Sequence, residues 1–154
     1  MTVSFESTVS IAASPERVFQ AMTDLEGARH WMKGLVRIEP LQAGPLRQGA
    51  RWRETRKMMG HEATEEFEVT ALEAPGRISL FCDGTKGTSG KGEYRFDYEI
   101  TPDGSGSKIR MRGSITMPGF FAKLFGRLFV GMFRSLCTKD LLSMKAHLEG
   151  SRGA

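Results

Sequence analysis

Apolar and polar residues alternate with a period of two through most of the chain, and this period changes near both ends. The alternation from Val3 to Ile11 predicts a half-buried strand. The next segment, ASPERVFQAM, predicts a helix, because Ser14 is a favourable N-cap and Pro15 suits the first helical position. A second short helix is expected over LEGARHWM, and Gly34 ends it.

Strand patterns then dominate until a long helix begins. Six segments have the composition of strands: LVRIEPL, ARWRETRKMM, EATEEFEVTAL, RISLFCD, EYRFDYEI and KIRMRGSITM. Residues 118–149 are expected to form one long helix. This order predicts an α+β fold, in which a curved antiparallel sheet of about seven strands packs against that helix. We expect one domain over residues 1–149 and a frayed tail over residues 150–154.

The first hairpin is expected to turn at Gly60-His61. Counted from this turn, Arg56 opposes Glu65. The register puts three apolar residues on the inward face: Trp52, Phe67 and Val69. Because side chains alternate along a strand, Glu54, Arg56 and Glu65 then point inward as well.

These inward charges have two interpretations. Buried charges are costly unless they are paired, so a solid core is a poor place for them. Either they lie at an open, solvated rim of the sheet, or they line a cavity that admits water or the polar head of a ligand. The sequence leaves both interpretations open.

The second hairpin is expected to carry an apolar inward face, made of Tyr94, Phe96, Tyr98, Ile100, Ile109, Met111, Gly113 and Ile115. Gly113 would face Phe96 and leave room over its ring. On the outer face, Glu99 is expected to meet Arg110. Asp97 is expected to meet Arg112 there, and such exposed pairs contribute about 0.2–1 kcal/mol each.

The final helix is predicted to be amphipathic. Its apolar face comprises Phe121, Phe125, Leu128, Phe129, Met132, Phe133 and Leu136, and its opposite face Lys123, Arg127, Arg134 and Lys145. Basic residues interrupt the apolar run, which argues against a membrane-spanning helix. A helix lying on a membrane surface stays open as an alternative. Gly126 and Gly131 favour a close approach to the sheet or a bend.

Composition narrows the functional classes. The net charge is +4, but acids and bases are interleaved, so we expect no nucleic-acid partner. Two cysteines and the lack of a basic leader favour a cytoplasmic protein. Three isolated histidines predict no metal site, and DGTKGTSGKGE departs from a phosphate-binding loop at both ends. We therefore expect no metal and no cofactor.

Three segments resemble members of the START-like (SRPBCC) superfamily, which includes polyketide cyclase/dehydrases, lipid-transfer proteins and Bet v 1-like carriers. They are SIAASPERVFQAMTDLEGARHWMKGLVRIEPL, GPLRQGARWRETRKMMGHEATEEFEVTALEAPGRISL and SITMPGFFAKLFGRLFVGMFRSLCTKDLLSMKAHLEG. The resemblance implies a helix-grip fold, in which the sheet wraps around the last helix, and a cavity for a hydrophobic or amphipathic molecule. It transfers no catalytic residue, because the superfamily shares no catalytic motif.

The leading hypothesis is a carrier or sensor that binds a hydrophobic small molecule or lipid between the sheet and the final helix. The expected lining is Phe19, Trp31, Trp52, Phe67, Tyr94, Phe96, Tyr98, Met111, Phe125, Phe129 and Met132. Glu54 and Arg56 could orient a polar head. One alternative is a polyketide cyclase or dehydratase, with Glu54 or Glu65 as general base and Arg56 stabilising an enolate.

A second alternative is a membrane-associated lipid- or quinone-transfer protein, which would contact the membrane transiently through the basic final helix. The chain is expected to be a monomer or a homodimer.

Overall fold

The computed structural model describes residues 1–150, apart from the side chains of Phe121, Ala122, Lys123 and Phe125. Its elements in chain order are β1 (Thr2–Ile11), α1 (Pro15–Thr23), η1 (Gly27–His30), β2 (Leu35–Pro40), β3 (Arg51–Met58), β4 (His61–Glu73), β5 (Arg77–Asp83), η2 (Gly84–Lys86), β6 (Glu93–Asp103), β7 (Gly106–Thr116) and α2 (Phe121–Gly150). This sequence of elements confirms the predicted α+β class.

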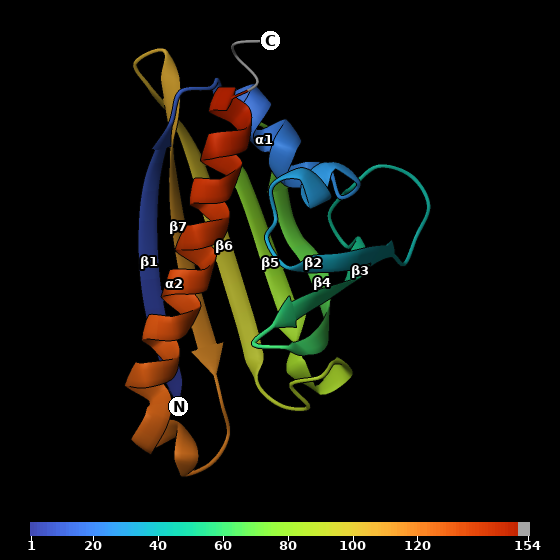
Figure 1. Ribbon diagram of the computed structural model, residues 1–154, viewed down its shortest axis with the longest axis vertical. Helices are drawn as coiled ribbons and strands as arrows, with labels where there is room; N and C mark the ends of the chain where they lie inside the picture. Colours follow the sequence, from blue (N-terminus) through green and yellow to red (C-terminus); the bar gives the residue numbers. More distant parts are fainter. Residues whose placement is uncertain (151–154) are drawn as a thin grey trace.

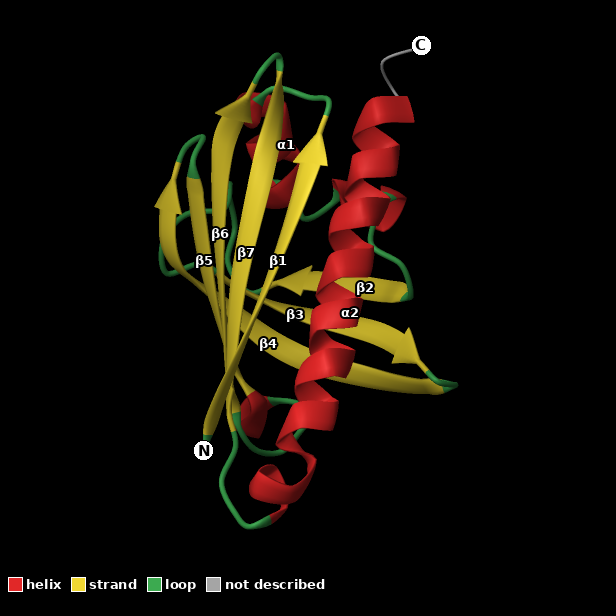
Figure 2. Cartoon of the chain, turned by 90° about the vertical axis from the view of Figure 1, so that its left-hand side faces the viewer, coloured by secondary structure: helices red, strands yellow, loops and turns green. Residues whose placement is uncertain are grey.

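The seven strands form one antiparallel sheet in the order β1-β7-β6-β5-β4-β3-β2. Figure 1 shows α2 running along the side of the sheet formed by β1, β7 and β6. Figure 2 shows β2, β3 and β4 turning across the direction of the other strands, so that the sheet curves around the helix. A register shift in β4 between Val69 and Ala71 contributes to this bend, since a β-bulge increases local twist. The arrangement is the helix-grip fold.

The first helix begins as predicted. Ser14 caps α1 by accepting a hydrogen bond from the Arg17 amide, and Pro15 occupies the first turn. The expected second helix is shorter than predicted: it is the single 3₁₀ turn η1. Ala28 of η1 is buried, and this turn closes the space between the curved sheet and α2.

The first hairpin turns one residue earlier than predicted. Its turn residues are Met59 and Gly60, both with positive φ, and Met58 pairs with His61. Two left-handed residues match the right-handed twist of the flanking strands, which explains this choice. The predicted opposition of Arg56 to Glu65 is therefore wrong, and Arg56 opposes Ala63. Because the pairing moved by two residues, an even number, every side chain keeps its predicted face.

The second hairpin has the predicted register: Phe96 pairs with Gly113, and Tyr98 pairs with Met111. The space over Gly113 is filled by Phe5 of β1, whose ring would lie 2.2 Å from a Cβ at this position. Glycine at 113 therefore leaves room for the tip of the Phe5 ring against the backbone of β7.

Side chains near the C-terminal end of α2 complete the core with residues of β1, α1 and β7. Leu141, Met144 and Leu148 of this helix are buried. At the opposite end of α2, Gly126 lies against β1, where an added Cβ would meet Met1 at 2.7 Å. Gly131 has no such neighbour, so only one of the two glycines makes the expected close approach. No helix of the described residues is long and apolar enough to cross a membrane.

Candidate ligand cavity

A cavity of about 220 Å³ lies between the inner face of the bent sheet, η1 and α2. Strands β3 to β6 supply one side of it, and the turn of α2 around Phe133, Leu136 and Cys137 supplies another. Six aromatic side chains belong to the lining: Trp31, Trp52, Phe67, Phe96, Tyr98 and Phe133. Trp52 stacks on Phe67 with 5.6 Å between ring centroids, so the wall is well packed.

One wall of the cavity carries an ionic cluster of Arg56, Glu54 and Asp140. Nε of Arg56 donates to Oε1 of Glu54 at 2.5 Å, and its Nη1 lies 2.7 Å from Oδ2 of Asp140. Glu54 is 7% exposed and the other two side chains are 22% exposed. Trp52 donates its indole N–H to Oε2 of Glu54. The cavity interpretation of these charges is therefore the one that the geometry supports.

Burial controls the electrostatics of this wall. It raises the pKa of Asp140, and the charge of Glu54 adds to this effect, although Arg56 opposes it. Burial lowers the pKa of Arg56, but the two carboxylates outweigh it and the net shift is upward. Burial also raises the pKa of Tyr98, and that of the Cys137 thiol to about 12. The guanidinium therefore stays charged, whereas the thiol stays protonated at neutral pH.

Glu65 lines the cavity on β4 and is fixed by the loop after η2. Its Oε1 accepts hydrogen bonds from the amide of Ser89 at 2.8 Å and from the Ser89 hydroxyl at 2.6 Å. A Cβ at Gly87 would lie 2.2 Å from Oε2 of Glu65 and 2.5 Å from the Thr64 carbonyl oxygen. The segment resembling a phosphate loop thus serves to hold Glu65 and to connect β5 to β6.

The predicted lining residues fall into four groups. The cavity brings together Trp31, Trp52, Phe67, Phe96 and Tyr98. Phe19, Tyr94 and Met111 pack in the core instead. Phe129 and Met132 are exposed at 47% and 42%, so their predicted place in the lining is wrong. The Phe125 side chain lies outside the described residues.

The misplaced residues have one cause. The helical wheel gave α2 a broad apolar face but could not orient it against the sheet. In the structure, Val130, Phe133 and Cys137 pack inward, while Leu128 is 77% exposed. Lys145, predicted to lie with the outer basic residues, instead donates to the Ser10 carbonyl of β1. Asp140 was missed entirely, although its four-residue spacing from Leu136, a predicted inward residue, was a usable signal.

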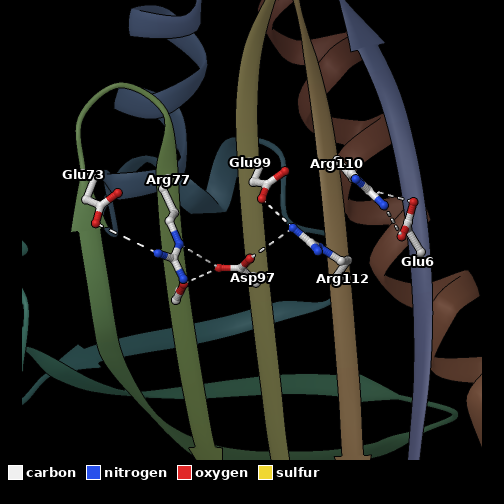
Figure 3. A network of polar contacts seen from close by, with 8 residues as sticks. Glu6, Glu73, Arg77, Asp97, Glu99, Arg110 and Arg112 are labelled. Atoms are coloured by element: carbon white, nitrogen blue, oxygen red, sulfur yellow. Dashed lines mark hydrogen bonds and ion pairs between the residues drawn. The ribbon is translucent and has the colours of Figure 1, made fainter.

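A larger hollow of about 930 Å³ lies on the outer face of the sheet. Exposed side chains that form ion pairs with one another line it. Figure 3 shows Arg112 between Asp97 and Glu99, and Arg110 against Glu6. The predicted pair of Asp97 and Arg112 is present at 3.9 Å, but Arg110 bonds Glu6 of β1 rather than Glu99. These shallow, mutually satisfied charges offer a ligand little apolar contact, so the smaller inner cavity is the candidate site.

The fold and its inner cavity define a START-like protein of the Bet v 1-like helix-grip type. A model of the family "Polyketide cyclase / dehydrase and lipid transport" matches residues 2–149, and the chain belongs to that family. No curated protein matches the chain.

Solved structures share the fold at low sequence identity. The protein TTHA0849 from Thermus thermophilus has a TM-score of 0.76 and 19% identity, covering 97% of this chain and 99% of that one. A conserved protein from Geobacillus kaustophilus has a TM-score of 0.78 and 14% identity, covering 97% of each chain. The major latex-like protein 151 from Panax ginseng has a TM-score of 0.78 and 8% identity, covering 96% and 97%. At such identities the likeness extends to the fold alone.

Proposed function

We propose that this protein is a carrier or sensor that binds one hydrophobic or amphipathic small molecule in the inner cavity. The observation that carries this proposal is a largely apolar cavity with an ionic cluster of Glu54, Arg56 and Asp140 on one wall. Ligand sites are typically apolar with a few polar groups that fix orientation. The cavity is smaller than the roughly 300–1,000 Å³ of drug-sized sites, so a compact ligand fits best.

Binding is favoured over catalysis by the state of the two candidate bases. Glu54 is held by Arg56 and Trp52, and Glu65 accepts both hydrogen bonds from Ser89. A general base must be free to take a proton from a substrate. Here each carboxylate would first have to give up donors that stabilise its charged form. Turnover that depends on pH and disappears in Glu54→Gln and Glu65→Gln variants would instead establish an enzyme.

Blocking the cavity tests the binding proposal. Ala63 lines the cavity, whereas its neighbour Glu62 points to the other face and is exposed. We expect Ala63→Phe to weaken binding of an uncharged apolar fluorophore, N-phenyl-naphthylamine, by about tenfold or more, because the ring occupies ligand space. Glu62→Phe adds the same ring outside and should bind like the unmodified protein. Equal binding by all three proteins would contradict the proposal.

Native mass spectrometry of freshly purified protein provides a second readout. A co-purified apolar molecule should accompany the unmodified protein and the Glu62→Phe variant and be depleted from Ala63→Phe. The mass of that molecule would also identify the ligand. Retention of the same molecule by Ala63→Phe would place its binding site elsewhere.

Ligand exchange at an anionic membrane surface is a second candidate function, and exposed apolar residues on α2 favour it. Leu124, Leu128, Phe129 and Met132 are all exposed, on the helix that supplies one cavity wall. The sequence has no acidic residue between Asp103 and Asp140, whereas Arg127 and Arg134 are exposed on the same helix. Apolar side chains flanked by basic ones match an anionic lipid surface.

Vesicle flotation at low salt distinguishes this membrane role. We expect the protein to float with phosphatidylserine-containing vesicles and to remain unbound with phosphatidylcholine alone. Leu128→Asp should abolish flotation. Leu142→Asp places the same charge at another exposed leucine of α2, beyond Asp140, and should leave flotation intact. Absence of flotation, or equal loss in both variants, would dismiss the membrane role without affecting the cavity proposal.

A further inference from the structure

The cavity has an excess of negative charge. Among the lining residues that the structure describes, four are acidic, namely Asp24, Glu54, Glu65 and Asp140, and Arg56 is the single basic one. Asp24 is exposed, whereas Glu54 is buried and Glu65 and Asp140 are half-buried. The protein as a whole carries a net charge of +4, so the cavity has the opposite sign to its surroundings.

Arg56 is already paired with two carboxylates of the protein, which makes it a poor anchor for an acid. Its Nε is taken by Glu54 at 2.5 Å and its Nη1 by Asp140 at 2.7 Å. A ligand carboxylate placed here would have to share one guanidinium with two resident carboxylates. Like charges held together in a partly desolvated site repel strongly, which disfavours an anionic head group. The earlier expectation that Arg56 orients a polar head therefore does not extend to fatty acids.

Hydrogen-bond acceptors and one hydroxyl remain accessible at the same wall. Oδ1 of Asp140 has no partner among the described residues, and neither does the hydroxyl of Tyr98, which also lines the cavity. No buried polar side-chain atom of the described residues lacks a partner, so these two groups keep some accessible surface, and both residues line the cavity. Burial raises the pKa of both groups, so the Tyr98 hydroxyl stays protonated at neutral pH.

We propose that the cavity selects amphiphiles whose polar end is a hydrogen-bond donor, most strongly a protonated amine and next a hydroxyl, and rejects carboxylates of the same chain length. The donor lies at Asp140 and Tyr98, and the chain lies along the aromatic wall of Phe67, Phe96 and Phe133. This ligand class rests on the proposed binding function and refines it.

The test uses three ligands with one chain length and different heads: octylamine, octanol and octanoate. Each displaces N-phenyl-naphthylamine from the full chain at neutral pH and physiological salt, and the uncharged probe avoids bias toward either sign. We expect octylamine to compete at a concentration at least about tenfold below that of octanoate, with octanol between them.

Two isosteric variants locate the selectivity. Asp140→Asn removes one negative charge from the cavity. It should weaken the binding of octylamine, strengthen the binding of octanoate and leave the binding of octanol almost unchanged. Glu99→Gln removes the same charge from the outer face, where Glu99 pairs with Arg112, and should leave the ranking of the three ligands intact. Circular dichroism checks that both variants are folded. If Asp140→Asn does not fold, the ranking of the three ligands on the unmodified protein still decides the question.

Three outcomes are distinguishable. The ranking of amine, alcohol and acid, with its collapse in Asp140→Asn alone, supports the proposal. Octanoate competing as well as or better than octanol overturns the selectivity, while leaving the binding function intact. Probe binding that Ala63→Phe does not weaken, or a probe that none of the three ligands displaces, overturns the use of this cavity altogether.

Discussion

The inner and outer faces of the sheet carry the same chemistry in different surroundings. Arg56 on the inner face and Arg112 on the outer face each lie between two carboxylates. Arg56 is 22% exposed beside a Glu54 that is 7% exposed, whereas Arg112 is 46% exposed. Water screens the outer pairs and contributes little to the inner ones. The comparison teaches that the burial of a charge, more than the identity of its partners, decides how much the charge affects stability.

Removing the central guanidinium from each face should give the largest contrast. Arg56→Met keeps much of the volume but leaves Glu54 and Asp140 without their common partner. We expect a loss of about 3 kcal/mol in the free energy of unfolding, because uncompensated buried charges are costly. Arg112→Met should cost below about 1 kcal/mol.

Urea unfolding at neutral pH measures both arginine variants. Equal losses of stability would mean that water solvates the inner cluster as well as the outer one. The charged wall of the cavity would then not differ electrostatically from the outer face.

A packing change on the inner face should have the next largest effect. Gly113→Ala drives a Cβ to within 2.2 Å of the Phe5 ring, and overpacking of this kind costs about 1–3 kcal/mol. Ser114→Ala alters the adjacent residue, which faces outward, and should change stability by less than about 0.5 kcal/mol. Thermal unfolding of the two variants checks this. A tolerated Gly113→Ala would show that Phe5 has room to move.

The salt dependence of ion-pair coupling should also differ between the two faces, with a smaller effect on stability. Arg110 and Glu6 form a bidentate outer pair at 2.9 and 3.0 Å, and we expect a small favourable coupling between these exposed side chains. That coupling should shrink in 1 M salt, where the screening length is about 3 Å. The coupling of Arg56 with Glu54 should persist. Double-mutant cycles at two salt concentrations measure both, and parallel loss would contradict the contrast.

The pH dependence of stability should have opposite signs at two aspartates. Burial raises the pKa of Asp140 above its ordinary value of 3.8, so its contribution to stability is present at low pH and is lost as the pH rises through the folded-state pKa. Burial also tends to raise the pKa of Asp97, but hydrogen bonds from Ser79 and Arg77 lower it below 3.8. The contribution of Asp97 is therefore lost as the pH falls below 3.8 toward its folded-state pKa.

Unfolding free energies of the unmodified protein, Asp140→Asn and Asp97→Asn across the acid range measure this difference. Relative to Asp140→Asn, the unmodified protein should lose stability as the pH rises above 3.8. Relative to Asp97→Asn, it should lose stability as the pH falls below 3.8. Two slopes of the same sign would refute the assignment of the inner site.

The sequence pattern predicted which side chains lie on the inner face of the first hairpin better than it predicted which residues pair across the two strands. Period-two alternation correctly placed Glu54, Arg56 and Glu65 on that face, even though the predicted turn was wrong. The error moved the pairing by two residues, and an even shift preserves the face of each side chain while changing its neighbour. In this hairpin the inward residues could thus be predicted, but the residue opposite each of them could not.

The sequence by itself determined the order of the elements, the cap of the first helix and the register of the second hairpin, because these depend on neighbouring residues. Only the tertiary structure decided how α2 rotates against the sheet. That rotation buries Phe133 against the core, exposes Leu128 and brings Asp140 to Arg56, which is 84 positions away in the chain. A helical pattern defines only a broad apolar face around the helix. The shape of the curved sheet selects which part of that face turns inward.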